Sequence, residues 1–311
     1  MAEKRKNPLV GLIEFVIAWA IFRTLGLLPR SLARMVSGTI AAIVYRLLGR
    51  LRRTGRRNLE LAFPELAADE REALLRESFQ NLGRVLAETS KFPRHTKKSI
   101  QDIIDIDSAN AFQKLCNDAR DKGKSVLVVT GHLGNWELFA FAFGALFEPI
   151  SFLARPLDNQ RLESFTYEIR SKFGNRPLSK TNSIYSAIRI LRKGGVIGVL
   201  ADVNAHPKEG VFVPFFGIPA CTTVGVAAIA IRANAVIVPG FCAWDDHRQR
   251  YITVFEPAIE PPQTGDMEAD ILSTTAAYTE ALERLIRQYP GQWLWIHRRW
   301  KTRPPGDVPL Y

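Results

Sequence analysis

Between residues 125 and 255 the chain alternates short β-branched runs with helical patterns, and few folds accommodate that order. Ser125–Thr130 (SVLVVT) and Val196–Ala201 (VIGVLA) are continuously apolar and rich in β-branched residues, as strands buried on both faces are. Further strand candidates are Ala235–Val238 and Tyr251–Phe255, and helical patterns lie at Trp136–Leu146, Leu162–Phe173 and Ile184–Lys193. The alternation predicts an α/β fold with a mostly parallel or mixed central sheet flanked by helices.

The amino end carries a nearly continuous apolar run, Pro8–Phe22, which only Glu14 interrupts. A full membrane span needs about 20 apolar residues, so this run is short, and a carboxylate inside it is costly. No small-x-small cleavage site follows, which argues against a cleaved signal peptide. We expect an uncleaved anchor, either a marginal span or a helix buried in one leaflet. The core helix of a soluble protein is the alternative.

A second apolar stripe, from Ser31 to Leu51, predicts an amphipathic helix, and Asp69–Ser90 predicts another. Six arginines crowd the end of the first stripe and the turn after it: Arg46, Arg50, Arg52, Arg53, Arg56 and Arg57. This combination is typical of an interfacial segment on an anionic leaflet, although a solvated helix face fits as well. The simplest division is an N-terminal membrane-associated helical segment over residues 1–57 and one α/β domain over residues 58–311.

The net charge of +11 favours an anionic partner, which a membrane surface, an acidic protein or an acidic substrate supplies. We expect no nucleic-acid partner, because no aromatic residues interleave with the arginines to form a stacking surface. The three cysteines, Cys116, Cys221 and Cys242, are widely spaced and form no CxxC unit. They are therefore expected to be small core residues.

Polar residues follow the first and second of these runs in the positions where open α/β sheets bind ligands. His132 comes after the strand at 125–130, and Asp202 comes after the strand at 196–201. Because ligands bind beyond the carboxyl ends of such strands, both residues are candidates for a functional site. Asp202 has a simpler alternative role as the cap of a loop or helix.

His132 is followed five positions later by Glu137. On one continuous helix this spacing would separate the two side chains by about 140°, but a turn before the helix can bring them together. Gly131 and Gly134 give such a turn its backbone freedom. A carboxylate bound to one imidazole nitrogen strengthens the other as a base. We predict that His132 and Glu137 are a catalytic pair that deprotonates a hydroxyl while its oxygen attacks an acyl thioester; a structural histidine is the alternative.

Nucleotide, metal and nucleophile motifs are not matched. Gly123-Lys124-Ser125 resembles the end of a P-loop, but Asp118 stands where the first glycine is required and the segment precedes its strand. The sequence contains no GxGxxG, HExxH or GxSxG motif. We therefore expect neither a metal nor a cofactor, and we disfavour a serine hydrolase.

An ordered set of motifs over residues 29–305 resembles the bacterial lipid A biosynthesis acyltransferases (lauroyl and myristoyl transferases), within the wider lysophospholipid acyltransferase-like group. The set comprises Asn58-Leu59, Ala62-Phe63-Pro64-Glu65, Gly131–Glu137 (GHLGNWE), Arg155–Asn159 (RPLDN), Asp202 in LAD, Gly210–Gly217 (GVFVPFFG) and Trp293–Lys301 (WLWIHRRWK). The HxxxxE core alone is suggestive, whereas the ordered set is specific.

The resemblance implies a glycerolipid acyltransferase-like domain on the cytoplasmic face of the cell inner membrane. Such an enzyme moves a fatty acyl chain from acyl carrier protein or CoA to a hydroxyl of an anionic glycolipid, such as a lipid A precursor. An acidic carrier protein and a phosphorylated acceptor both suit a basic chain. An apolar groove for the acyl chain has candidate lining residues, which core packing explains equally well: Phe139, Phe141, Phe143, Phe212, Phe215 and Phe216.

The resemblance also implies residue roles. His132 matches the general base, Glu137 its partner carboxylate, and Arg170 and Asp202 a functional arginine and acid. The residues expected to contact substrate are Arg155, Arg170, Asp202, Gly134 and Asn135, with Arg155, Arg170 or Arg176 as phosphate partners. Arg170 as an ordinary surface charge is the alternative. Trp293–Lys301 either packs beside the active site or forms a membrane-interface belt.

Other functions stay open at the level of sequence. The acceptor could be a different glycolipid, such as a phosphatidylinositol mannoside. A lipid-binding protein that keeps the fold without catalysis is the hypothesis from another class, and the His132/Glu137 pair argues against it because a pure binder needs no base.

Overall fold

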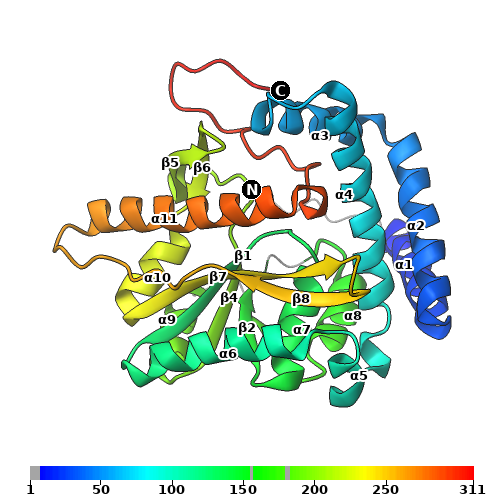
Figure 1. The fold of residues 1–311 in the computed structure, drawn as a ribbon, viewed down its shortest axis with the longest axis horizontal. Coiled ribbons are helices and arrows are strands. Elements are labelled where there is room, and N and C mark those ends of the chain that lie inside the picture. The colour runs from blue at the N-terminus through cyan, green and yellow to red at the C-terminus, as the bar shows by residue number, and fades with distance from the viewer. Residues whose placement is uncertain (1–7, 155–156, 179–182) are drawn as a thin grey trace.

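A six-stranded sheet, in the order β3-β2-β4-β1-β7-β8, forms the centre of the computed structural model, which describes residues 8–154, 157–178 and 183–311 (Figure 1). The strands are β1 (Ser125–Thr130), β2 (Ile150–Leu153), β3 (Arg176–Leu178), β4 (Val196–Leu200), β7 (Ala235–Asp245) and β8 (Arg250–Phe255). β7 and β8 pair antiparallel, and the other neighbours pair parallel. The predicted α/β fold with a mixed central sheet is confirmed.

Helices cover both faces of this sheet (Figure 1). On one face lie α6 (Ile106–Asp121) and α7 (Trp136–Leu146); on the other lie α9 (Ser183–Arg192), α10 (Gly225–Ala233) and α11 (Met267–Gln288). Successive side chains of a strand point to opposite faces, so Val126 and Val128 pack with the first group while Leu127 and Val129 pack with the second. Burial on both faces explains why β1 is apolar throughout.

A small hairpin and several short helices complete the domain. The GVFVPFFG motif forms strand β5 (Gly210–Phe215) and the turn into β6 (Ile218–Thr223), where Phe216 and Gly217 both have positive φ. The remaining elements are α5 (Lys97–Gln101), α8 (Gln160–Arg170), η1 (Phe92–Arg94), η2 (Pro207–Glu209) and η3 (Pro290–Gln292). Phe215 and Phe216 pack in the core against tryptophans of the C-terminal segment.

The first four helices of the described chain are α1 (Pro8–Leu27), α2 (Arg30–Leu47), α3 (Gly49–Ala62) and α4 (Ala68–Thr89). The single helix expected from Ser31 to Leu51 breaks at Leu48, and α2 and α3 meet at 88°. Of the described helices, α1 is the one long and apolar enough by itself to cross a membrane. The expected boundary between residues 57 and 58 falls inside α3, and the two-part division stays a prediction.

A buried carboxylate on α4 holds α2 in place. Glu88 of α4 is fully buried and accepts hydrogen bonds from Arg30 Nε at 2.8 Å and Arg34 Nε at 3.1 Å, both on α2. The Arg34 guanidinium also lies 4.0 Å from the ring centre of Trp244 on β7. Removing either partner of a buried ion pair leaves an uncompensated charge, so these contacts hold α2 at a fixed place on the domain.

Candidate active site

The turn between β1 and α7 requires two glycines. A Cβ on Gly131 would lie 2.9 Å from the Asp202 carboxylate, so only glycine lets that carboxylate approach the turn. Gly134 has φ +58°, and a Cβ there would collide with the carbonyl of Cys242. The backbone of His132 is held from the other side, because Leu294 N donates to its carbonyl at 3.0 Å. This turn presents the His132 side chain at the carboxyl edge of the sheet.

Asp202 is the hydrogen-bond partner of the His132 ring. β1 and β4 are neighbouring parallel strands, so residues that follow them meet at one edge. His132 Nδ1 lies 2.9 Å from Asp202 Oδ1, and the His132 backbone N–H donates to Oδ2 at 2.6 Å. Trp293 Nε1 donates to the same Oδ2 at 2.8 Å. With Nδ1 as the donor, Nε2 is the basic nitrogen, and it makes no hydrogen bond to any described residue.

The two groups shift each other's pKa in opposite directions. Burial alone would raise the pKa of the Asp202 carboxyl, but the His132 charge and the hydrogen bonds from His132 and Trp293 lower it to about 2. Burial alone would likewise lower the pKa of His132, yet the Asp202 carboxylate, with a smaller contribution from Glu137, raises it above the ordinary value. Asp202 is therefore ionised at neutral pH and supports positive charge on the imidazole.

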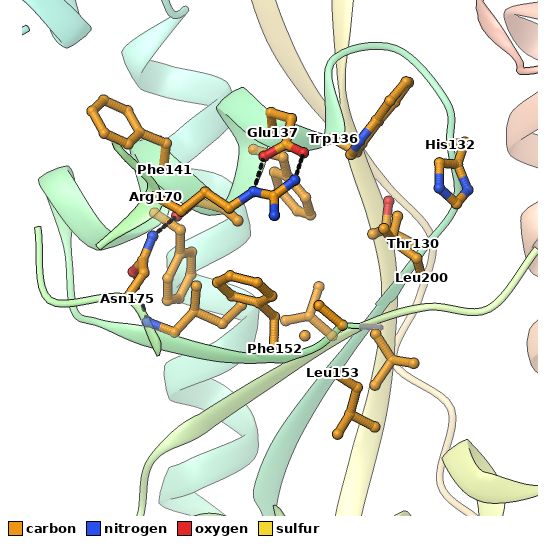
Figure 2. A pocket seen from close by; sticks show the side chains of 18 of the residues that line it. Thr130, His132, Trp136, Glu137, Phe141, Phe152, Leu153, Arg170, Asn175 and Leu200 are labelled. Carbon is orange, nitrogen blue, oxygen red and sulfur yellow. Dashed lines mark hydrogen bonds and ion pairs between the residues drawn. The ribbon is translucent and has the colours of Figure 1, made fainter. Parts of the chain in front are cut away.

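Glu137 binds Arg170 and not the His132 ring, which differs from the expected catalytic pair. Its carboxylate forms a bidentate ion pair with the guanidinium of Arg170, with Nε to Oε2 at 2.8 Å and Nη2 to Oε1 at 2.5 Å. Glu137 is in the first turn of α7, and this turn directs its side chain toward α8 (Figure 2). Within the described part of the chain, its effect on His132 is one of charge, without a hydrogen bond.

Gly134 and Asn135 form the turn and are not among the described residues that line the cavity beside it, and their contact with substrate stays a prediction. Asn135 is fully buried and caps α7, accepting a hydrogen bond from Leu138 N at 3.0 Å. Its amide nitrogen donates to the hydroxyl of Tyr251 at 3.3 Å. An asparagine at this position supplies the cap that the first turn of a helix needs.

A cavity of about 370 Å³ opens beside His132, with Glu137 and Arg170 on its wall (Figure 2). It runs between the sheet and the helices that cover it. Apart from the polar groups at the edge, its lining is largely apolar, with Phe112, Val128, Phe139, Phe143, Ile150 and Phe152 among the residues. Apolar walls with a few convergent polar groups are characteristic of small-molecule sites.

Comparison with known proteins identifies a protein family for this chain. The family model for bacterial lipid A biosynthesis acyltransferases matches residues 3–302. The chain belongs to that family. The acyltransferase is 28% identical to the lipid A biosynthesis palmitoleoyltransferase of Escherichia coli over 286 residues, covering 91% of this chain and 90% of the relative. The lauroyltransferase of E. coli is 28% identical over 277 residues, covering 88% and 86%, and its myristoyltransferase is 25% identical over 276 residues, covering 88% and 83%.

The other predicted site residues of the acyltransferase fall in different places. Arg170 lines the cavity, Arg176 is exposed on β3, and Arg155 lies outside the described residues. Of the six candidate phenylalanines, Phe139, Phe141 and Phe143 line the cavity and Phe212, Phe215 and Phe216 do not. Because Trp293, Trp295 and Trp300 are buried, their segment packs beside the active site and forms no membrane-interface belt.

The pairing of His132 with Asp202, and the hydrogen bond from Trp293, were not foreseen from the sequence of the acyltransferase. The signal for the first was present, since both residues follow buried strands whose carboxyl ends can meet at one edge. No local signal identifies Trp293, which lies 91 positions from Asp202 and reaches it only through the fold.

Proposed function

We propose that this protein transfers a fatty acyl chain from a thioester of acyl carrier protein, or of CoA, to a hydroxyl of a lipid A precursor. His132 Nε2 takes the proton of the hydroxyl as its oxygen attacks the thioester carbonyl carbon. The carbon–sulfur bond then breaks, the new ester forms, and the thiolate leaves and is protonated. Asp202 holds Nδ1–H and stabilises the imidazolium.

One observation supports this proposal above the others. An apolar cavity opens beside His132, whose Nδ1 is hydrogen-bonded to the buried carboxylate of Asp202. An acyl chain in the cavity would bring its thioester to the end where His132 lies. A lipid-binding protein of the same fold would gain nothing from an ionised carboxylate buried beside the imidazole, because burying a charge costs folding free energy.

Arg170 and Glu137 have a separate proposed role at the same cavity. Glu137 occupies two nitrogens of the guanidinium, and the third, Nη1, makes no hydrogen bond to a described residue and can meet an anionic group. A cation here suits either the oxyanion that develops on the thioester carbonyl or a phosphate of the acceptor. Glu137 fixes the orientation of the guanidinium through two hydrogen bonds.

The first test is a transfer assay with acyl carrier protein thioesters and a tetra-acylated lipid A precursor. His132→Ala should lower kcat roughly 10²- to 10⁴-fold, since it removes the base. His247→Ala, at an exposed histidine far along the chain, is the matched control and should keep full activity. Normal turnover by a folded His132→Ala protein would disprove the role of His132. No product from wild type with this acceptor would favour another glycolipid, such as a phosphatidylinositol mannoside.

The cavity predicts control of acyl-chain length by Gly198. This glycine pairs with Val128 of β1 and Phe152 of β2, and a Cβ on it would lie 2.9 Å from Cδ1 of Ile150. Gly198→Ala would therefore place its methyl group, or a displaced Ile150, in the path of the chain. Competition between thioesters of different length should show a preference shifted toward shorter chains, with turnover of the shortest unchanged. An unchanged length profile would place the chain elsewhere.

We also propose that α1 lies in the membrane interface of the cytoplasmic leaflet of the inner membrane. Asn159 Nδ2 donates to Gly11 O at 2.8 Å, and Phe22 packs on Phe165 of α8 with ring centres 5.4 Å apart. Together with the contact of Gly26 with Ser90, these hold about 22 Å of α1 against the domain. A span with these contacts would take the exposed charges of α8 into hydrocarbon, whereas an in-plane helix leaves them in water.

A further inference from the structure

A second cavity, of about 500 Å³, lies on the opposite side of α8 from the active site. It is bounded by the last turns of α1, the connection from α4 to η1, and α8. From α8 and the residues after it, Arg170 faces the first cavity, while Phe165, Ile169 and Lys172 line the second. The two cavities share no lining residue, so a ligand of the second does not enter the acyl site.

The second cavity has an apolar floor and a cationic rim. Phe22, Phe165 and Ile169 are among its apolar residues. Three cations border it, Arg23, Arg94 and Lys172, against the single carboxylate of Glu168. In the described part of the chain, none of the three cations forms an ion pair; Lys172 Nζ donates to the carbonyl of Pro93 at 2.7 Å, and Arg23 lies over the ring of Trp19. The rim thus has an excess of two positive charges.

The position of the cavity indicates what kind of anion it meets. One wall is the C-terminal end of α1, whose outer face exposes apolar side chains, among them Leu12, Ile13, Val16 and Ile17. Trp19 lines the cavity and is 43% exposed, as tryptophans at the headgroup level of a bilayer are. Cations beside an apolar helix face fit a molecule with an anionic head and a hydrocarbon tail.

We propose that this cavity binds the headgroup of an anionic phospholipid, separately from the acyl donor and the acceptor. Arg94 and Lys172 contact the phosphodiester, Arg23 closes the site from α1, and one acyl chain follows the exposed face of α1. The excess of positive charge suits an anionic head, such as that of phosphatidylglycerol. The bound lipid would link α1 to α8 and so hold the helix that carries Arg170 at the bilayer surface.

The test measures binding by the full chain in neutral detergent, using isothermal titration calorimetry with dihexanoyl phosphatidylglycerol and dihexanoyl phosphatidylcholine. Wild type should bind the anionic lipid at least about tenfold more tightly. Arg94→Ala/Lys172→Ala should weaken that binding roughly 10- to 30-fold, at about fivefold for each cation lost near a lipid phosphate. The matched control is Lys122→Ala/Lys193→Ala, which removes two exposed lysines before β1 and β4 and should bind as wild type does.

Other outcomes overturn the proposal. Equal affinity for the two lipids, or an equal loss in the control variant, would show that no specific headgroup site exists. Inorganic phosphate binding as tightly as phosphatidylglycerol would make the cavity a free-phosphate site. If a lipid A precursor displaces phosphatidylglycerol, and the double variant raises the KM for that acceptor, the cavity belongs to the acceptor. The readout is binding, so failure of the acyl-transfer proposal would leave this result standing.

Discussion

Asp202 and Glu137 both raise the pKa of His132, but their surroundings differ sharply. The Asp202 side chain is 3% exposed and accepts hydrogen bonds from the ring and backbone of His132 and from Trp293. The Glu137 side chain is 16% exposed and binds one partner, the guanidinium of Arg170 on another helix. Of the two carboxylates, only Asp202 is fixed by the turn, by a neighbouring strand and by the C-terminal segment together.

The difference separates two tasks that the sequence assigns to one pair of residues. A buried carboxylate with three donors is preorganised, so it fixes the imidazole tautomer at no cost during the reaction. The Glu137–Arg170 pair joins α7 and α8 at the cavity wall, where it can respond to the charge of a ligand. We infer that Asp202 orients His132 and raises its basicity, and that Glu137 orients the guanidinium of Arg170. The predictions below test this separation.

Among variants of the residues around His132, Asp202→Asn should have the largest effect, lowering kcat by about 10²- to 10³-fold, because the amide no longer stabilises the imidazolium. The pH profile identifies the cause. Asp202 raises the pKa of His132, and the base must be deprotonated to act, so the acid limb of kcat/KM should move to lower pH in the variant. An acid limb that stays in place would show that Asp202 does not control the base.

The same variant predicts a pH window in stability. Because the pKa of Asp202 is lower in the folded state, this group stabilises the fold at pH values above 3.8, and the stabilisation is lost as the pH falls toward about 2. Because the pKa of His132 is higher in the folded state, this group stabilises the fold at pH values below 6.5, and the stabilisation is lost as the pH rises through the pKa of the folded state. Urea unfolding of wild type and Asp202→Asn should therefore differ most between these values and less at pH 9.

Glu137→Gln should have an intermediate effect, lowering kcat/KM roughly 10- to 100-fold, because it weakens two charge-assisted hydrogen bonds to Arg170. A double-mutant cycle with Arg170→Ala should give a coupling of about 1 to 3 kcal/mol, whereas Glu137→Gln with Asp202→Asn should be nearly additive. If Glu137→Gln instead moves the acid limb as far as Asp202→Asn does, Glu137 is the partner of His132 as the sequence predicts.

The strands β1, β4, β7 and β8, their alternation with helices and the position of His132 could be predicted because each depends on a short stretch of chain, whereas β2, β3, β5 and β6 were not predicted. The SVLVVT run forms β1 as expected, and the turn after it carries His132 at the sheet edge. What could not be predicted depends on contacts between distant segments. His132 binds Asp202 and not Glu137 because β4 lies beside β1. The sequence indicates that both residues follow buried strands, but it does not indicate that these two strands are neighbours.

The same limit explains the break of the second helix. The apolar stripe from Ser31 to Leu51 continues through Leu48, yet the chain bends there so that α2 packs on α4 while Asn58 of α3 reaches the C-terminal segment. Asn58 Nδ2 donates to the carbonyls of Trp295 and His297 at 2.5 and 2.6 Å. Periodicity reports which residues are apolar and does not report which distant surface they meet.

Trp293→Phe should have the smallest effect and is the sharpest probe of the Asp202 environment. It removes one donor to Oδ2 and leaves the two from His132, so kcat should fall roughly two- to tenfold. A carboxylate with fewer donors holds its charge less dispersed and attracts the imidazolium more, so the acid limb should move slightly to higher pH, opposite to Asp202→Asn. Trp295→Phe is the control, because this buried indole donates to the carbonyl of Pro290 and not to Asp202. Equal pH shifts in both variants would trace the effect to lost packing and not to the hydrogen bond.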